Sequence, residues 1–181
     1  MAEKKLRVKK FTIIFSKDRI FSEQNKESRV LYDKSRFGEP VEGKFQYSIV
    51  EALLLLEKGY AKVVDGKSKK LNIDDFINKA EKLEKSFWTK YCVYADLRER
   101  GYIVKTALKF GADFRVYDKG VKPGDDHARW IVYPVKENES FTWHDFSAKN
   151  RVAHSTRKKL LLAVVDDEGD VSYWESSWIK P

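Results

Sequence analysis

Three side chains that lie far apart in this 181-residue sequence could together act on a phosphodiester. Tyr117 ends an apolar stretch, His127 closes the polar loop that follows, and Lys158 precedes a second apolar run. An imidazole, with a reference pKa of about 6.5, can pass a proton to a leaving group, and an ammonium can stabilise charge developing on phosphorus. A phenol, with a reference pKa of about 10, is a poor base unless a cation lies near it. Each residue also has an ordinary structural interpretation: a strand-end aromatic, a surface histidine and a partner for a helix dipole.

Other kinds of active site find no support in the sequence. The three histidines, at positions 127, 144 and 154, do not fall at a metal-ligand spacing such as H-E-x-x-H. The single cysteine, Cys92, excludes an internal disulfide and a cysteine-based zinc site. Ser155 lacks the G-x-S-x-G elbow of many hydrolases, and there is no G-x-x-x-x-G-K-[ST] loop. We therefore expect no metal ion and no cofactor.

The elements that must position these side chains begin near residue 87. Large apolar residues recur at spacings of three and four from Phe87 to Leu97, which predicts a helix closed by Gly101. A second helix should begin after Thr142 as N-cap. The turn "DDEGD" between apolar runs predicts a hairpin over Val164–Tyr173. The segments predicted to be strands are "YIVKTAL", "ADFRVYD", "ARWIVYPV", "LLLAVVD" and "DVSYWESSWIK".

The first half of the chain has a different predicted pattern, with short strands and helices. Lys9–Phe15 and Arg29–Asp33 are predicted strands, whereas "FGEPVEGKFQ", with two glycines and a proline, is predicted to be irregular. Ser48, with Glu51 three residues later, predicts a capping box at the start of a helix. Asn72 could cap the next helix.

These patterns predict an α/β (α+β) protein of two domains, because a sheet that carries helices forms an α/β unit. Residues 1–84 would form a small mixed domain, and residues 85–181 a domain with a central mixed sheet. The net charge of +8 favours an anionic partner, nucleic acid first. No apolar run approaches the roughly 18 residues that a membrane span needs, and the N-terminus lacks a signal-peptide core. We expect a soluble, cytoplasmic protein without a membrane partner.

From Tyr91 to Pro181 the sequence resembles the catalytic domain of the archaeal tRNA-splicing (tRNA-intron) endonucleases. The similarity lies in "YADLRERGYIVKTALKFGADFRVYDKG", in the histidine after "GDD", in "RVAHSTRKKLLLAVVDDEGDV" and in the closing "WIKP". The stretch "SIVEALLLLEKGY" resembles the helix of the family's N-terminal domain. The resemblance implies the short single-unit form of the family, with a restriction-endonuclease-like catalytic domain.

The resemblance also implies a site. The family's catalytic triad is a Tyr, a His and a Lys, and the matching residues are Tyr117, His127 and Lys158. The family cuts precursor tRNA at bulge-helix-bulge structures without metal, leaving a 2′,3′-cyclic phosphate and a 5′-hydroxyl. Tyr117 would then orient or deprotonate the 2′-hydroxyl, His127 would protonate the departing 5′-oxygen, and Lys158 would hold the charge of the phosphorane. We expect no DNA substrate.

The acidic turn between the last two strands cannot face the same RNA as the basic segment before it without repulsion. By resemblance, this turn docks into a basic cleft of another subunit and fixes a homotetramer, or a heterotetramer with a structural subunit. Opposite charges on one molecule permit such head-to-tail contacts. The expected interface residues are Asp166, Asp167, Glu168 and Asp170.

Recognition of a bulge needs surfaces on which unpaired bases can stack. By resemblance, Arg151 and an aromatic residue of the last hairpin clamp a bulge base. Tyr173 or Trp174 could be that aromatic residue, and only one of them can face the RNA because strand neighbours alternate between faces.

Two alternatives stay open from the sequence. Asp113 could be one ligand of a metal-dependent, structure-selective nuclease, although no partner carboxylate followed by a lysine is evident. The chain could instead be a non-catalytic RNA-binding subunit of a splicing complex, although structural subunits of the family lack the triad that is present here.

Overall fold

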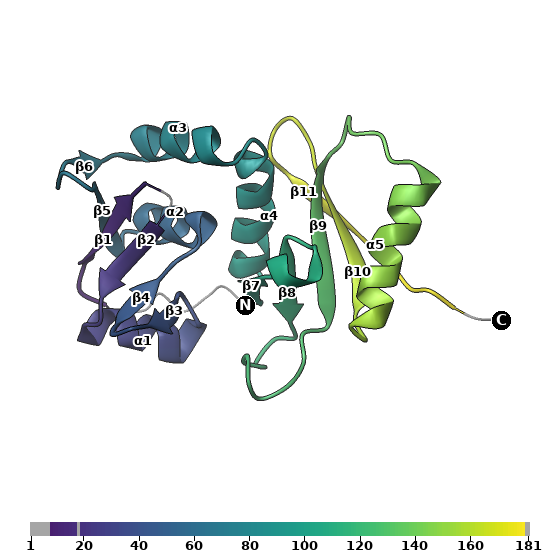
Figure 1. Cartoon of the computed structure of the whole chain (residues 1–181), viewed down its shortest axis with the longest axis horizontal. Coiled ribbons are helices and arrows are strands. Elements are labelled where there is room, and N and C mark those ends of the chain that lie inside the picture. Colours follow the sequence, from purple (N-terminus) through teal and green to yellow (C-terminus); the bar gives the residue numbers. More distant parts are fainter. Residues whose placement is uncertain (1–7, 18, 180–181) are drawn as a thin grey trace. The chain divides into compact units, whose positions relative to one another are not determined.

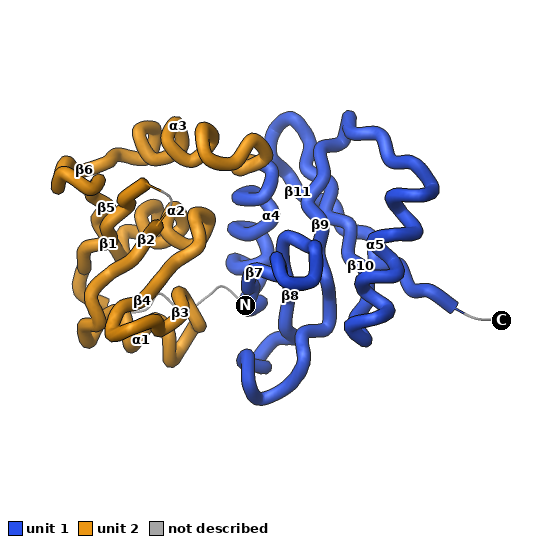
Figure 2. Tube along the Cα trace, viewed as in Figure 1, with its two compact units in different colours: residues 1–3, 89–181 blue, residues 4–88 orange. Residues whose placement is uncertain are grey.

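The computed structural model describes residues 8–17 and 19–179, and these form two compact units (Figures 1 and 2). One unit ends at Trp88 and the other begins at Thr89. The predicted mixed α/β class is confirmed, because each unit combines helices with a sheet that has both parallel and antiparallel strand pairs. None of the helices in the described residues is long and apolar enough to cross a membrane.

The first unit is built on a sheet with the strand order β3-β4-β2-β1-β5-β6, in which β1 and β5 are parallel. Phe15 and Phe76 are both fully buried, with ring centroids 5.0 Å apart, so β1 packs against α3 in the core. The described elements of this unit are β1 (Phe11–Ser16), β2 (Arg19–Glu23), α1 (Lys26–Ser35), β3 (Glu39–Val41), β4 (Lys44–Gln46), α2 (Ile49–Glu57), β5 (Ala61–Asp65), β6 (Lys70–Leu71) and α3 (Ile73–Leu83).

Helices α2 and α3 begin where the sequence predicts. The Ser48 N–H donates to Glu51 Oε2 at 2.9 Å, and the Glu51 N–H donates to Ser48 Oγ at 3.3 Å. This reciprocal pair is the predicted capping box. At α3, the Asp75 N–H donates to Asn72 Oδ1 at 2.7 Å. Both capping predictions are therefore confirmed.

The prediction of a strand at Arg29–Asp33 is wrong, because these residues lie inside α1. Asn25 begins this helix: its Oδ1 accepts the Ser28 N–H at 2.8 Å, and its own N–H donates to Ser28 Oγ at 3.0 Å. Leu31 is then fully buried. The N-terminal cap and this burial outweigh the β propensity of the valine and tyrosine in the segment.

The prediction that "FGEPVEGKFQ" is irregular is also wrong, because it contains the antiparallel pair β3 and β4. Glu42 and Gly43 connect the two strands with φ values of 47° and 77°. Two successive positive φ angles are typical of the type I′ turn that joins tight hairpins. Pro40 is tolerated because β3 is the edge strand of the sheet.

The second unit contains a sheet with the strand order β11-β10-β9-β8-β7, in which β9 and β10 are parallel. Helices α4 and α5 lie on opposite sides of this sheet (Figure 1). The described elements of this unit, with the start of α4 at the division, are α4 (Phe87–Glu99), β7 (Ile103–Thr106), the short 3-10 helix η1 (Leu108–Phe110), β8 (Phe114–Tyr117), β9 (Trp130–Lys136), α5 (Trp143–Ser155), β10 (Lys159–Val165) and β11 (Val171–Ser176).

The two faces of this second sheet pack against different helices. Tyr94 of α4 contacts Phe114 of β8, with ring centroids 5.9 Å apart. On the other face, Ile131 and Leu160 share a buried cluster with Ala153 of α5. Since side chains alternate along each strand, these contacts fix which residues of β8 to β11 can reach either face.

Two further predictions hold in this unit. The Asp145 N–H donates to Thr142 Oγ1 at 3.1 Å, so Thr142 is the N-cap of α5. Strands β10 and β11 form an antiparallel pair that closes at Val165 and Val171, which confirms the predicted hairpin.

Candidate active site

Tyr117 is the last residue of β8, and the strand fixes the direction of its side chain. Arg115, two residues earlier, lies on the same side of the strand, with its Cζ 6.0 Å from the centroid of the Tyr117 ring. Tyr117 is buried, at 4% exposed. Packing therefore holds this ring in place.

His127 belongs to the loop that connects β8 to β9, and both ends of this loop are attached to the sheet. The Arg129 N–H donates to Val116 O at 2.9 Å, and the Arg129 guanidinium donates to Asp118 Oδ1 at 3.1 Å. Within the loop, the His127 N–H donates to Asp126 Oδ1 at 2.6 Å. The residue is exposed. The loop thus presents an accessible imidazole from an anchored backbone.

Lys158 lies where α5 ends and β10 begins, as the sequence indicates. Its N–H donates to Ala153 O at 2.8 Å, and its Nζ donates to Thr156 O at 2.7 Å. Partial burial lowers the pKa of the Lys158 ammonium, and the nearby cation of Arg115 lowers that pKa further. This ammonium is thus already partly stripped of water.

Tyr117, His127 and Lys158 line one cavity of about 410 Å³. They reach it from three different places: a strand end, a loop and a helix-to-strand junction. The other residues in its described lining are Phe110, Arg115, Gly124, Asp125, Asp126 and Ala128. A phenol, an imidazole and an ammonium around one cavity can supply proton transfer and charge stabilisation for an internal attack on a phosphodiester.

Arg115 is a residue of this cavity that the sequence analysis missed. Its Nε is buried, and no acceptor for it is present among the described residues. A buried guanidinium nitrogen without an acceptor is costly, and the same side chain adds a second cation to the lining of the cavity beside Lys158. The available signal was the spacing of two residues from Tyr117 on a predicted strand, which places both side chains on one face.

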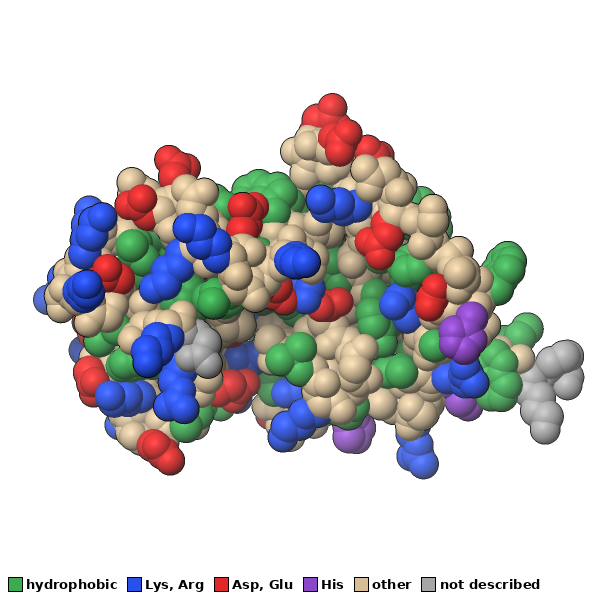
Figure 3. All heavy atoms as spheres, turned by 45° about the horizontal axis from the view of Figure 1, so that its top comes forward, with side chains coloured by type: hydrophobic (Ala, Val, Ile, Leu, Met, Phe, Trp, Pro, Cys, Tyr) green, Lys and Arg blue, Asp and Glu red, His purple; other side chains and the backbone are tan. Residues whose placement is uncertain are grey.

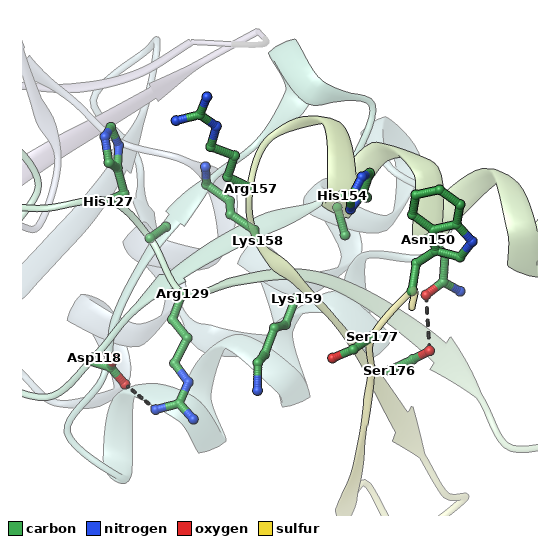
Figure 4. Close-up of a pocket in the computed structure, with 13 residues that line it drawn as sticks. Asp118, His127, Arg129, Asn150, His154, Arg157, Lys158, Lys159, Ser176 and Ser177 are labelled. Atoms are coloured by element: carbon green, nitrogen blue, oxygen red, sulfur yellow. Dashed lines mark hydrogen bonds and ion pairs between the residues drawn. The ribbon is translucent and has the colours of Figure 1, made fainter. Parts of the chain in front are cut away.

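A second cavity, of about 500 Å³, adjoins the first and shares His127, Ala128 and Lys158 with it (Figure 4). We call it the basic cavity. Its remaining lining residues are Asp118, Arg129, Asn150, Ala153, His154, Arg157, Lys159, Ser176, Ser177 and Trp178. The sequence shows the basic segment after α5 but not the cavity, because Arg129 joins it from the loop before β9.

Comparison of the sequence with known proteins identifies the family of this chain. The family description "tRNA intron endonuclease, catalytic C-terminal domain" matches residues 87–173, and "tRNA intron endonuclease, N-terminal domain" matches residues 12–77. The tRNA-splicing endonuclease of Thermococcus onnurineus is 46% identical to this chain over 165 residues, which cover 91% of this chain and 94% of that protein. The tRNA-splicing endonucleases of Pyrococcus furiosus and Methanothermobacter thermautotrophicus are 44% identical over 165 residues and 42% identical over 154 residues. The alignments cover 91% and 85% of this chain, and 94% and 89% of those proteins.

The chain belongs to the tRNA intron endonuclease family. Tyr117, His127 and Lys158 all lie within the part that matches the catalytic C-terminal domain of the tRNA intron endonucleases. That match also includes the other candidate residues of the sequence analysis except Trp174, and none of them is in the described lining of the cavity of these three side chains.

Two of the three residues expected to stack on RNA are exposed. Arg151 lies on α5 and lines a further cavity of about 490 Å³ with Ser176 and Trp178. Trp174 is 55% exposed. In contrast, the Tyr173 hydroxyl donates to Asp96 Oδ2 of α4 at 2.6 Å. Burial, and then this carboxylate, raise the pKa of Tyr173 above its ordinary value.

The acidic turn is closed by its own hydrogen bonds. The Asp166 N–H donates to Asp170 O at 3.1 Å, and the Asp170 N–H donates to Asp166 Oδ1 at 2.8 Å. Asp167, Glu168 and Asp170 are exposed. None of the four carboxylates lines the triad cavity or the basic cavity in the described part of the chain.

Overall charge does not mark the site. On the face seen in Figure 3, lysine and arginine side chains are spread among acidic ones. Arg157, Lys158 and Lys159 of the basic cavity are consecutive in the sequence, and the fold adds Arg129 to them.

Asp113, the residue of the metal-dependent alternative, is paired with a lysine. Its Oδ1 lies 2.6 Å from Lys90 Nζ, and both side chains are mostly buried. Asp113 is absent from the described lining of the triad cavity and of the basic cavity. In residues 8–17 and 19–179, no group of three or more His, Cys, Asp or Glu side chains is placed to hold a metal ion.

Proposed function

We propose that this chain is the catalytic subunit of a tRNA-splicing endonuclease that cuts precursor tRNA at bulge-helix-bulge splice sites. The observation that supports the proposal most is the single cavity lined by Tyr117, His127 and Lys158 in a chain of the tRNA intron endonuclease family. The tRNA-splicing endonucleases that it resembles cover nearly its whole length.

The proposed reaction is an attack of a ribose on its own phosphate, without a metal ion. The 2′-oxygen forms a bond to phosphorus while the bond from phosphorus to the 5′-oxygen breaks. Tyr117 orients the 2′-hydroxyl or takes its proton, and His127 gives a proton to the departing 5′-oxygen. The products are a 2′,3′-cyclic phosphate and a 5′-hydroxyl, so atoms and charge balance without water.

In this reaction, the cations of the cavity stabilise the negative charge that develops on the phosphorane. The pentavalent phosphorane carries more negative charge than the ground state, and fixed cations in a partly buried site stabilise that difference. Lys158 has lost part of its hydration, and Arg115 has a buried Nε without an acceptor. Lys158 therefore gains more from a phosphorane oxygen than a solvated lysine would, and Arg115 adds a second cation to the same cavity.

We further propose that residues 85–181 are the catalytic domain and residues 1–84 an N-terminal domain of the same enzyme. The two family descriptions match residues 87–173 and 12–77, which supports this assignment. The acidic turn would dock on another subunit, in a homotetramer or in a heterotetramer with a structural subunit. Its exposed carboxylates, held by a closed turn, suit a rigid electrostatic contact.

The proposed roles can be tested with a bulge-helix-bulge RNA in the presence of EDTA. The variant His127→Ala should cut this RNA about 100- to 10,000-fold more slowly than the wild type, because it loses the general acid, while RNA binding persists. His144→Ala is the matched control, since His144 is an exposed histidine in the first turn of α5 and lines neither cavity. Equal cutting rates for both variants would show that His127 is not the acid.

A further inference from the structure

Helix α5 ends in an energetically unfavourable way. The Arg157 N–H donates to His154 O at 2.9 Å and the Lys158 N–H donates to Ala153 O at 2.8 Å, the two hydrogen bonds of a Schellman motif. In this motif the residue after the cap is left-handed, and Arg157 has a φ of 56°. Side chains are strained in this conformation, so glycine normally occupies the position.

The same chain uses glycine at two equivalent helix ends. After α2, the Gly59 N–H donates to Leu56 O, and after α4, the Gly101 N–H donates to Arg98 O. Gly59 and Gly101 have φ values of 73° and 89°. The arginine after α5 therefore differs from these two helix ends; α1 also ends in a left-handed arginine, Arg36, but its guanidinium packs on the Tyr32 ring.

The Arg157 side chain does not gain stability from contacts within the described residues. It is exposed, and no hydrogen bond or ion pair of its guanidinium is present there. The other cations at the same cavity are engaged: the Arg129 guanidinium donates to Asp118, and Lys159 Nζ lies 2.5 Å from Glu175 Oε1. In Figure 4, Arg157 and Lys158 extend together in one direction, whereas Arg129 and Lys159 extend in another.

The helix end itself does not repel an anion strongly at this place. The C-terminal carbonyls of a helix are its negative pole, and at α5 those of Val152, Ala153 and His154 accept hydrogen bonds. Val152 O accepts from the Thr156 N–H, and Thr156 O accepts from Lys158 Nζ. These hydrogen bonds reduce the repulsion of an anion by the helix end, and Lys158 and Lys159 of the same cavity follow Arg157 directly.

We propose that Arg157 binds the RNA phosphate next to the scissile one, in the basic cavity beside the triad. This inference rests on the proposed function. The triad cavity and the basic cavity share His127 and Lys158, so the basic cavity lies directly beside a scissile phosphate in the triad cavity and is open to a neighbouring phosphate of the same strand. Arginine suits the role because its planar group can donate two parallel hydrogen bonds to a phosphate. The strained backbone places the guanidinium at that position.

The variant Arg157→Gly separates this role from folding. Glycine keeps the left-handed turn and relieves the strain, so we expect the melting temperature to rise by about 2–4 °C. The probe is a bulge-helix-bulge RNA with a single 2′-deoxyribose at the cleavage nucleotide, titrated at several KCl concentrations. Loss of one charged phosphate contact should weaken its binding by about ten- to a hundredfold. The slope of log affinity against log salt should become shallower by about 0.7–0.9.

Arg36→Gly is the matched control. Arg36 ends α1 with the same φ of 56°, but its guanidinium packs on the Tyr32 ring. This control should bind the RNA as the wild type does. Unchanged affinity and salt slope in Arg157→Gly, or an equal loss in both variants, would overturn the subsite. A wild type in its complete assembly that binds the deoxy RNA but leaves the all-ribose RNA uncut would refute the proposed activity, while the binding comparison would still decide the role of Arg157.

Discussion

Replacing Tyr173 with Phe should reduce stability without reducing RNA cleavage. The Tyr173 hydroxyl donates to Asp96 Oδ2 at 2.6 Å, and a hydrogen bond to a charged group contributes about 1.5–3 kcal/mol. Arg100 Nε also lies 2.6 Å from the same oxygen, so the carboxylate keeps a partner in the variant. We therefore expect the variant to lose unfolding free energy at the low end of this range, about 1.5 kcal/mol. For a chain of this size, that loss lowers the melting temperature by about 3–6 °C.

The pH dependence of this loss gives a second readout. The pKa of Tyr173 is raised in the folded state, so the protein holds the phenolic proton more tightly when folded than when unfolded. The stabilisation is complete below the unfolded pKa of about 10 and is lost as the pH rises through the folded pKa. The difference in unfolding free energy between the wild type and Tyr173→Phe should thus become smaller above about pH 10. A variant that melts like the wild type at neutral pH would refute the stabilising role of the hydrogen bond from Tyr173 to Asp96.

Trp174→Ala should weaken RNA binding and leave stability nearly unchanged, the reverse of Tyr173→Phe. The indole is 55% exposed, so its removal should change the unfolding free energy by about 0.5 kcal/mol or less. Stacking of one base contributes about 1–3 kcal/mol, so binding of the bulged RNA should weaken about five- to 150-fold. Unchanged RNA affinity in a fluorescence anisotropy titration would show that Trp174 is not the stacking residue.

Three more predictions follow from single contacts. Thr142→Ala removes the N-cap of α5 and should cost about 1 kcal/mol, seen as a melting temperature lower by about 2–4 °C; an unchanged melt would contradict it. Arg115→Met removes a cation that lowers the pKa of Lys158, so the NMR titration of Lys158 should shift to higher pH and cleavage should slow, whereas an unmoved titration would refute the coupling. Asp167→Lys combined with Glu168→Lys should reduce the native mass, because charge reversal repels a basic cleft; a tetramer that survives would exclude docking through these carboxylates.

Local signals in the sequence predicted much of the scaffold. Capping by Ser48 and Thr142 depends on residues three positions apart, so the pattern is visible without the fold. The hairpin with the acidic turn was predictable for the same reason. The errors lie where local signals compete. At α1, the Asn25 cap was overlooked beside a β-prone segment, and at β3 and β4 glycine and proline were interpreted as a loop when they form a tight turn.

Some residues of the candidate site could likewise be predicted from the sequence, and others could not. Tyr117, His127 and Lys158 were found through a resemblance that quotes long stretches of sequence, and a residue-type argument alone left each with an ordinary interpretation. Arg115 and Arg157 were not found. The role of Arg115 depends on a buried nitrogen without an acceptor, and that of Arg157 on a backbone conformation, and neither property can be read from residue type.

The most direct test of the proposed reaction removes a single oxygen atom, the 2′-oxygen at the cleavage site, from the substrate. A bulge-helix-bulge RNA with one 2′-deoxyribose at the cleavage nucleotide lacks the attacking hydroxyl but keeps its phosphates. Incubated with the purified protein in EDTA, it should remain intact, while the all-ribose RNA yields 2′,3′-cyclic phosphate and 5′-hydroxyl ends by mass spectrometry. Cleavage of the deoxy RNA at the same bond would show that water, and not the ribose, attacks the phosphate.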